Sequence, residues 1–194
     1  MERENQRITI TKRMLKESLL EILREKELDT INVAELCRKA GVNRATFYRH
    51  YAIPRDVLME MQQDLFRELR RQVKLPQSMD EIHATIEKLC VFLNDHLELL
   101  RIFVQTFSDT EFAMFMNDLY LELGKEFSCM DVLKKLSKED LQLLTLYSTG
   151  GSYFVLRSWI MGSIRKSPKE MADYVYSLVD KTKQLLIAGL AEKK

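Results

Sequence analysis

A repeated signal for the start of a helix constrains the fold of this chain most strongly. At five breaks between segments of apolar periodicity, a serine or asparagine is followed three residues later by an acid: Asn32 and Glu35, Ser78 and Glu81, Ser108 and Glu111, Ser137 and Asp140, Ser167 and Glu170. The cap oxygen accepts a free backbone N–H, and the acid reaches back to the cap's own N–H. With only six glycines and three prolines, and no strand-like alternation, these signals predict an all-α chain.

The apolar periodicity divides the sequence into about nine predicted helices: 9–26, 33–40, 44–51, 54–74, 79–94, 96–107, 109–128, 138–164 and 168–191. The helix at 54–74 is long enough to connect a small N-terminal head to a larger body. We therefore predict two domains, residues 1–53 and residues 54–194, with helix 54–74 as the connector.

The stretch Ile31–Tyr51 predicts a helix-turn-helix. Its first short helix directs Leu36 and Ala40 inward and ends at Gly41, which tolerates the left-handed backbone of a tight turn. Asn43 then caps a second short helix. This geometry places the second helix in the major groove of DNA in proteins that use it.

The second helix has two different faces. Phe47 and Tyr51 lie four residues apart and are predicted to point into a three-helix core. The opposite face carries side chains suited to guanine edges and phosphates, flanked by two further hydrogen-bond donors: Arg44, Ala45, Tyr48 and Arg49, with Thr46 and His50 at its sides. The alternative is an ordinary surface helix with mixed polar residues.

Residues 8–58 resemble the N-terminal domain of the TetR family of bacterial regulators, whose pattern ends in Phe or Tyr. The matching positions are Ile31, Val33, Leu36, Ala40, Gly41, Val42, Thr46, Phe47, Tyr48, His50 and Tyr51. The resemblance implies a homodimer that reads a palindromic operator, usually as a repressor. The DNA contacts that it implies are Val33, Arg44, Ala45, Thr46, Tyr48, Arg49 and His50.

The chain departs from the family at the start of the fourth helix. The family commonly has a lysine there that meets a phosphate, and this chain has Pro54. Proline suits the first position of a helix because its missing N–H is not needed there. Arg55 is then the candidate for the phosphate contact.

The last two predicted helices resemble the pair through which the family dimerises. Gly150 and Gly151 permit close approach between helices. The candidate interface residues are Tyr147, Gly151, Phe154, Tyr174, Leu178 and Leu185. Packing inside the core of one chain is the alternative explanation for the same stripe.

Aromatic residues and methionines gather in the middle of the chain, where the family often has an apolar effector cavity. The candidate pocket residues are Phe103, Phe107, Phe112, Met116, Tyr120 and Trp159. They predict an apolar small-molecule effector, since methionine repacks around varied ligands, but a plain hydrophobic core explains them equally. The segment from Tyr147 to Ile160 also resembles a TetR-like subgroup that includes coactivators controlled by a partner protein.

The remaining features of the sequence argue against an enzyme, a metalloprotein or a membrane protein. The three histidines fit no metal or catalytic motif, no glycine-rich phosphate loop is present, and the three cysteines are widely spaced. We therefore expect no enzyme activity, metal or cofactor. No apolar run reaches 18 residues and the N-terminus is charged, so we expect a cytoplasmic protein without a membrane partner.

Charge leaves one alternative open. Residues 1–74 carry 16 Lys and Arg against 12 Asp and Glu, and residues 75–194 carry 14 against 17, so that +4 and −3 give the net charge of +1. A basic head and an acidic body suit a DNA-binding regulator. Solvated helix faces of mixed sign explain these counts almost as well. A helical interaction protein that keeps a vestigial head is a separate alternative for the function.

Overall fold

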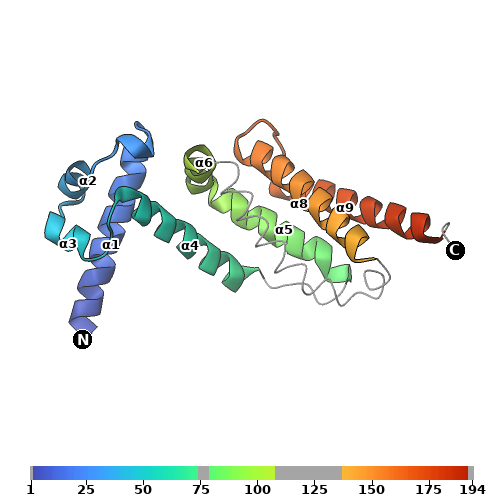
Figure 1. Ribbon diagram of the computed structural model, residues 1–194, viewed down its shortest axis with the longest axis horizontal. Helices are drawn as coiled ribbons and strands as arrows, with labels where there is room; N and C mark the ends of the chain where they lie inside the picture. Colours follow the sequence, from blue (N-terminus) through green and yellow to red (C-terminus); the bar gives the residue numbers. More distant parts are fainter. Residues whose placement is uncertain (1, 74–78, 108–136, 192–194) are drawn as a thin grey trace. The chain divides into compact units, whose positions relative to one another are not determined.

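The computed structural model describes residues 2–73, 79–107 and 137–191, and all regular elements in these ranges are helical (Figure 1). The N-terminal elements are α1 (Glu2–Leu23), the 3-10 turn η1 (Leu28–Thr30), α2 (Val33–Ala40), α3 (Arg44–Tyr48) and α4 (Pro54–Gln72). The later elements are α5 (Met79–Asp95), α6 (Leu97–Thr106), α8 (Lys138–Ile160) and α9 (Pro168–Ala191). The predicted all-α class is confirmed.

The observed bounds differ from the predicted ones mainly at helix ends. Helix α1 begins at Glu2 instead of residue 9, because the Glu, Arg and Gln residues between positions 2 and 7 are good helix formers. Helix α8 ends at Ile160 instead of residue 164, because Gly162, two residues after Ile160, takes the left-handed conformation with φ 80°. The predicted helix 109–128 lies outside the described residues.

Three of the predicted capping residues accept hydrogen bonds from backbone amides three positions later. The N···O distances are 2.9 Å for Asn32 and Glu35, 3.0 Å for Ser137 and Asp140, and 3.3 Å for Ser167 and Glu170. Glu170 also accepts from the Ser167 N–H at 2.8 Å, which completes the reciprocal capping box. Ser78 and Ser108 lie outside the described residues.

The described chain divides into two compact units, residues 1–68 and residues 69–194, so the division falls within α4. In the first unit, α2 contacts both α1 and α3. Its fully or nearly fully buried side chains come from every helix of the unit: Leu15, Leu19, Leu36, Phe47, Val57, Leu58 and Leu65. Most of α4 belongs to this unit because its apolar side is buried there, whereas the sequence suggested a division before α4.

In the second unit, α5 packs on α9 and on α6, and α6 packs on α8. The buried side chains include Ile82, Cys90, Phe92, Leu100, Phe103, Phe107, Tyr153, Leu156, Trp159, Ile160 and Met171. None of the described helices combines the length and the apolar character that crossing a membrane requires.

The turn between α2 and α3 depends on a left-handed glycine. Gly41 has φ 65° and ψ 25°, and its N–H donates to the carbonyl of Arg38. The Val42 N–H donates to the carbonyl of Cys37 at 3.0 Å, so the last turn of α2 is closed by two backbone hydrogen bonds. The turn leads directly to Asn43, which caps α3.

We predict that Gly41→Ala lowers the free energy of unfolding by about 1–2 kcal/mol, which is the usual cost of a left-handed L-residue. The added Cβ would have Met14 Cε as its nearest neighbour, at 3.9 Å, so backbone strain and not a steric clash causes the loss. Gly41→Asn is the matched control, since asparagine tolerates this conformation better. Urea unfolding measures both, and equal losses would contradict the strain argument.

Candidate nucleic-acid interface

Helix α3 is held by a cap at its start and by aromatic residues on its inner side. The Asn43 side chain accepts the Ala45 N–H at 2.8 Å. Phe47 is fully buried and Tyr51 is 5% exposed, with their ring centroids 5.7 Å apart. The helix itself ends at Tyr48, but the His50 and Tyr51 amides still donate to the Phe47 carbonyl, so the chain continues as a tight turn.

The opposite side of α3 faces solvent. Arg44, Ala45 and Arg49 are exposed, and the Tyr48 side chain is 60% exposed. Among the described residues, neither Arg44 nor Arg49 forms an ion pair. The remaining candidates from the sequence are half-buried, namely Val33, Thr46, His50 and Arg55.

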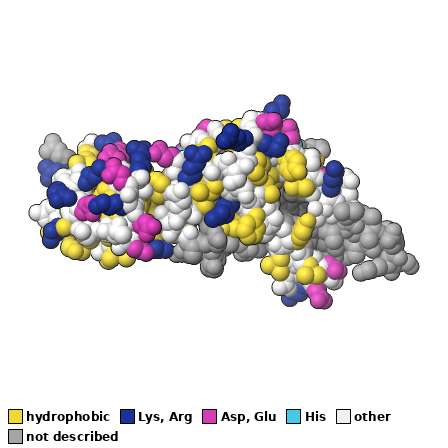
Figure 2. Space-filling view, turned by 90° about the horizontal axis from the view of Figure 1, so that it is seen from above, with side chains coloured by type: hydrophobic (Ala, Val, Ile, Leu, Met, Phe, Trp, Pro, Cys, Tyr) yellow, Lys and Arg dark blue, Asp and Glu magenta, His cyan; other side chains and the backbone are white. Residues whose placement is uncertain are grey.

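Several other cations of the first unit are neutralised by nearby acids. The N···O distance is 2.5 Å between Lys26 and Glu35, and 2.9 Å between Lys39 and Glu21. On the face shown in Figure 2, basic and acidic side chains of this unit are intermixed. The unit therefore presents no broad basic field there, and Arg44 and Arg49 of α3 have no acidic partner among the described residues.

The backbone N–H groups just before α4 donate hydrogen bonds to a side chain of the same helix. Pro54, the first residue of α4, has no N–H, and Asp56 Oδ2 accepts the Ala52 N–H at 2.8 Å and the Ile53 N–H at 3.0 Å. A phosphate that approached these two amides would have to displace the Asp56 carboxylate. Arg55 stays the candidate for a phosphate contact here.

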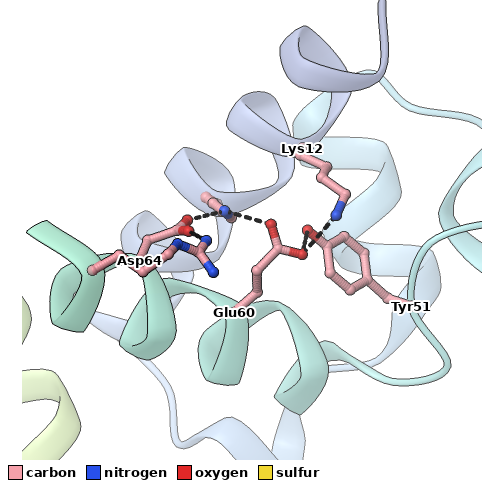
Figure 3. Close-up of polar contacts among 6 residues, drawn as sticks. Lys12, Tyr51, Glu60 and Asp64 are labelled. Atoms are coloured by element: carbon pink, nitrogen blue, oxygen red, sulfur yellow. Dashed lines mark hydrogen bonds and ion pairs between the residues drawn. The ribbon is translucent and has the colours of Figure 1, made fainter. Parts of the chain in front are cut away.

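Behind α3, a polar cluster connects α1, the residue Tyr51 and α4 (Figure 3). Glu60 Oε2 accepts the Tyr51 hydroxyl at 3.0 Å and the Lys12 ammonium at 2.7 Å. Glu60 Oε1 accepts the Lys16 ammonium at 2.8 Å, and Lys16 also donates to Asp64 at 2.5 Å. Lys12 lies 5.3 Å from the centre of the Tyr51 ring, a cation–π distance.

These contacts shift the proton affinities of the cluster. Burial alone would raise the pKa of Glu60, but hydrogen bonds from Lys12 and Lys16 outweigh it and lower the pKa to about 2. Burial, together with the negative charge of Glu60, raises the pKa of the Tyr51 hydroxyl. The pKa of Lys16 is depressed by burial but raised, on balance, by Asp64 and Glu60. Glu60 and Lys16 therefore stay charged, and Tyr51 stays protonated, across the neutral range.

This cluster was not predicted from the sequence, although a signal for it exists. Lys12 and Lys16 are four residues apart on α1, and Glu60 and Asp64 are four residues apart on α4. Residues at this spacing lie on one helix face, so two such pairs of opposite charge indicate packing between the helices.

The candidate effector residues that the structure describes are buried in the second unit. Phe103 and Phe107 belong to α6 and its C-terminal cap, and Trp159 belongs to α8; they are 1%, 6% and 5% exposed. The Trp159 indole N–H donates to the Lys166 carbonyl at 2.8 Å. Phe112, Met116 and Tyr120 lie outside the described residues, so the effector site stays a prediction.

The candidate dimer residues lie on exposed parts of α8 and α9. The exposed fractions are 71% for Tyr147, 63% for Phe154, 55% for Tyr174 and 46% for Leu178. A Cβ added to Gly151 would meet nothing within 4 Å. The side chain of Leu185 lies outside the described set. These helices thus carry large apolar side chains that stay exposed in the described part of their unit.

The described residues contain no group of three or more His, Cys, Asp or Glu side chains arranged to hold a metal ion. Cys37 and Cys90 are buried free thiols, and burial raises the pKa of Cys90 to about 12. A thiol with that pKa stays protonated and unreactive at neutral pH.

A helix-turn-helix head followed by a second helical unit defines the class of a helical transcriptional regulator. Residues 80–181, more than half of the chain, match the TetR_C_8 family, described as "Transcriptional regulator C-terminal region". The chain belongs to the TetR family of transcriptional regulators. Members of this family are regulators and not enzymes; they bind DNA and usually act as dimers.

The chain is also similar to individual proteins. It is 28% identical over 186 residues to the "Uncharacterized HTH-type transcriptional regulator YxbF" of Bacillus subtilis strain 168, a match that covers 91% of this chain and 47% of the relative. The chain therefore spans about half the length of that relative.

Two solved structures share the fold at low sequence identity. A TetR transcriptional regulator from Streptococcus agalactiae 2603V has a TM-score of 0.67 and 16% identity, covering 91% of this chain and 97% of its own. A TetR-family regulator from Syntrophomonas wolfei str. Goettingen has a TM-score of 0.71 and 13% identity, covering 89% and 94%.

The lowered pKa of Glu60 predicts a specific acid sensitivity. Because its folded-state pKa of about 2 lies below its ordinary value of 4.5, ionised Glu60 stabilises the fold above pH 4.5. This contribution is lost as the pH falls from 4.5 towards 2. We expect the free energy of unfolding to fall less steeply over this window in Glu60→Gln than in the unchanged protein. Chemical unfolding at a series of pH values measures the slopes, and parallel curves would contradict the prediction.

Proposed function

We propose that this chain is a homodimeric repressor that binds a palindromic operator through α3. The observation that carries the proposal is the division of α3 into two faces. Phe47 is fully buried on the inner side, while Arg44 and Arg49 are exposed on the outer side without ion pairs to other described residues. Cations without intramolecular partners do not have to break existing bonds when they bind DNA.

Each residue of the outer face has a chemical role in this proposal. A guanidinium forks onto the O6 and N7 atoms of guanine or onto a phosphate, as Arg44 and Arg49 would do. Ala45 lies between them and is small enough to let the helix approach the groove closely. Thr46 and His50 at the sides donate to phosphate oxygens, which fix the register of the protein on the duplex.

A palindromic operator requires two heads held by one two-fold interface, with half-sites about 34–36 Å apart. The exposed apolar side chains of α8 and α9 support such an interface. On α8, Leu143, Tyr147 and Phe154 recur at helical spacing and are 60%, 71% and 63% exposed. Burying one side chain of this size is worth about 1.5–3 kcal/mol, and a two-fold interface buries each twice.

Release by an apolar small-molecule effector completes the proposal. The support for it is the aromatic character of the core beside α6 and α8, where the rings of Phe103 and Phe107 lie 5.7 Å apart between centroids and are tilted by 45°. An effector that binds one conformation of the dimer better than the other shifts the population toward that conformation. If that conformation spaces the heads differently, the dimer leaves the operator.

We predict that Arg44→Ala and Arg49→Ala each weaken binding to the specific site by about 1–3 kcal/mol, because each removes one forked contact. Fluorescence anisotropy at fixed salt measures the affinity, on a duplex selected from random sequences. Arg165→Ala is the matched control, since it removes an exposed arginine of the second unit. Equal losses in all three variants would contradict the assignment of α3 as the reading helix.

We further predict that Tyr147→Glu combined with Phe154→Glu converts the dimer to a monomer. Two charges on each partner would face each other across the two-fold axis and would have to be desolvated. Val91→Glu is the control, because Val91 is an exposed residue of α5, with 44% exposure, outside this face. Sedimentation velocity gives the masses; a double variant that stays dimeric would place the interface elsewhere.

A further inference from the structure

The outer face of α3 is oriented by what lies behind it. The helix has five residues, too few to be stable alone, so its orientation depends on its anchors. Asn43 anchors the beginning and Phe47 the middle. After the helix, the next anchored side chain is Tyr51, which directly follows the candidate contact residues Arg49 and His50.

We propose that the Tyr51 hydroxyl, Glu60 and Lys12 form a tie that sets the orientation of α3 and thereby the sequence specificity of the head. Tyr51 and Glu60 are then positioning residues that do not touch DNA themselves. This inference rests on the proposed function, because it takes α3 to be the reading helix.

The hydroxyl is not required for burial of the ring. The TetR-like pattern accepts Phe or Tyr at this position, and a phenyl ring would fill the same space between Phe47 and the core. A buried hydroxyl without a partner would destabilise the fold. Here the hydroxyl donates to Glu60 Oε2 at 3.0 Å, and the same oxygen accepts the Lys12 ammonium at 2.7 Å. The hydroxyl therefore adds a directional contact to a position that hydrophobic packing alone would leave free to slide.

The tie has a fixed geometry because three elements converge on one carboxylate. Lys12 comes from α1, Glu60 from α4, and Tyr51 from the turn that follows α3 (Figure 3). Lys12 contacts both Glu60 and the face of the Tyr51 ring, so the three side chains restrain one another. Hydrogen bonds to a charged acceptor are stronger and shorter than neutral ones, which makes the restraint stiff.

Specific binding is sensitive to small changes in orientation. A bidentate contact between arginine and guanine needs the two partners within about 0.5 Å and 10–20° of the productive geometry. Non-specific binding depends on charge and tolerates such changes. Loss of the tie should therefore reduce specific affinity while leaving non-specific affinity unchanged.

The test compares Tyr51→Phe with the unchanged chain of 194 residues. Anisotropy titrations measure the affinity for the selected duplex and for a scrambled duplex at the same salt concentration. We expect the ratio of specific to non-specific affinity to fall about 3- to 10-fold, the equivalent of one hydrogen bond. Glu60→Gln should lower the ratio as well, because it removes the charge that fixes both Tyr51 and Lys12; it also provides the test if Tyr51→Phe does not fold.

Asp64→Asn is the matched control. It weakens the ion pairs with Lys16 and Arg67 in the same cluster but leaves the Tyr51–Glu60 hydrogen bond. We expect it to lower thermal stability without changing the affinity ratio.

A purely structural role makes a different prediction. All three variants would then be less stable, but their folded fractions would keep the full affinity ratio, and this result would overturn the inference. An equal fall of the ratio in Asp64→Asn would also overturn it. If the unchanged protein has no specific site, the proposed function fails and this inference fails with it. A specific site whose affinity ratio survives in Tyr51→Phe and Glu60→Gln overturns the inference alone.

Discussion

Burial of Phe47 and Tyr51 determines which side of α3 faces solvent. Phe47 lies on α3 and Tyr51 in the turn that follows it, and the burial of both side chains turns Arg44, Ala45, Tyr48 and Arg49 outward. Each buried aromatic ring contributes about 1.5–3 kcal/mol, which is large compared with the propensity of a five-residue helix. The side chains that the proposed function assigns to DNA are thus exposed as a consequence of hydrophobic packing on the other side.

Much of the head could be predicted from the sequence because its signals are local. Asn32, Gly41 and Asn43 act through hydrogen bonds and backbone angles within three residues, so their roles follow from their spacing. The cluster around Glu60 could not be read in the same way, since Lys12 and Glu60 are 48 residues apart and meet only when α1 packs on α4. The paired spacing of charges on both helices was the available signal.

The second unit was predicted less completely for a physical reason. Apolar stripes on α6, α8 and α9 predict that these side chains are buried, but they do not indicate whether they pack inside the chain or against a partner. The structure separates them: Phe103 and Trp159 are in the core, whereas Tyr147 and Phe154 remain exposed on α8. A stripe that the described residues leave exposed favours a partner, and two-fold symmetry would let an identical chain supply it.

Selection of bound sequences from random duplex DNA, at a stated near-physiological salt concentration, tests the central claim most directly. A dimer that reads with α3 predicts one enriched inverted repeat whose half-sites are centred about one helical turn apart, roughly 10 base pairs. A single enriched half-site without a repeat would contradict the two-fold arrangement. No enrichment, with only salt-sensitive binding, would contradict sequence reading by α3 itself.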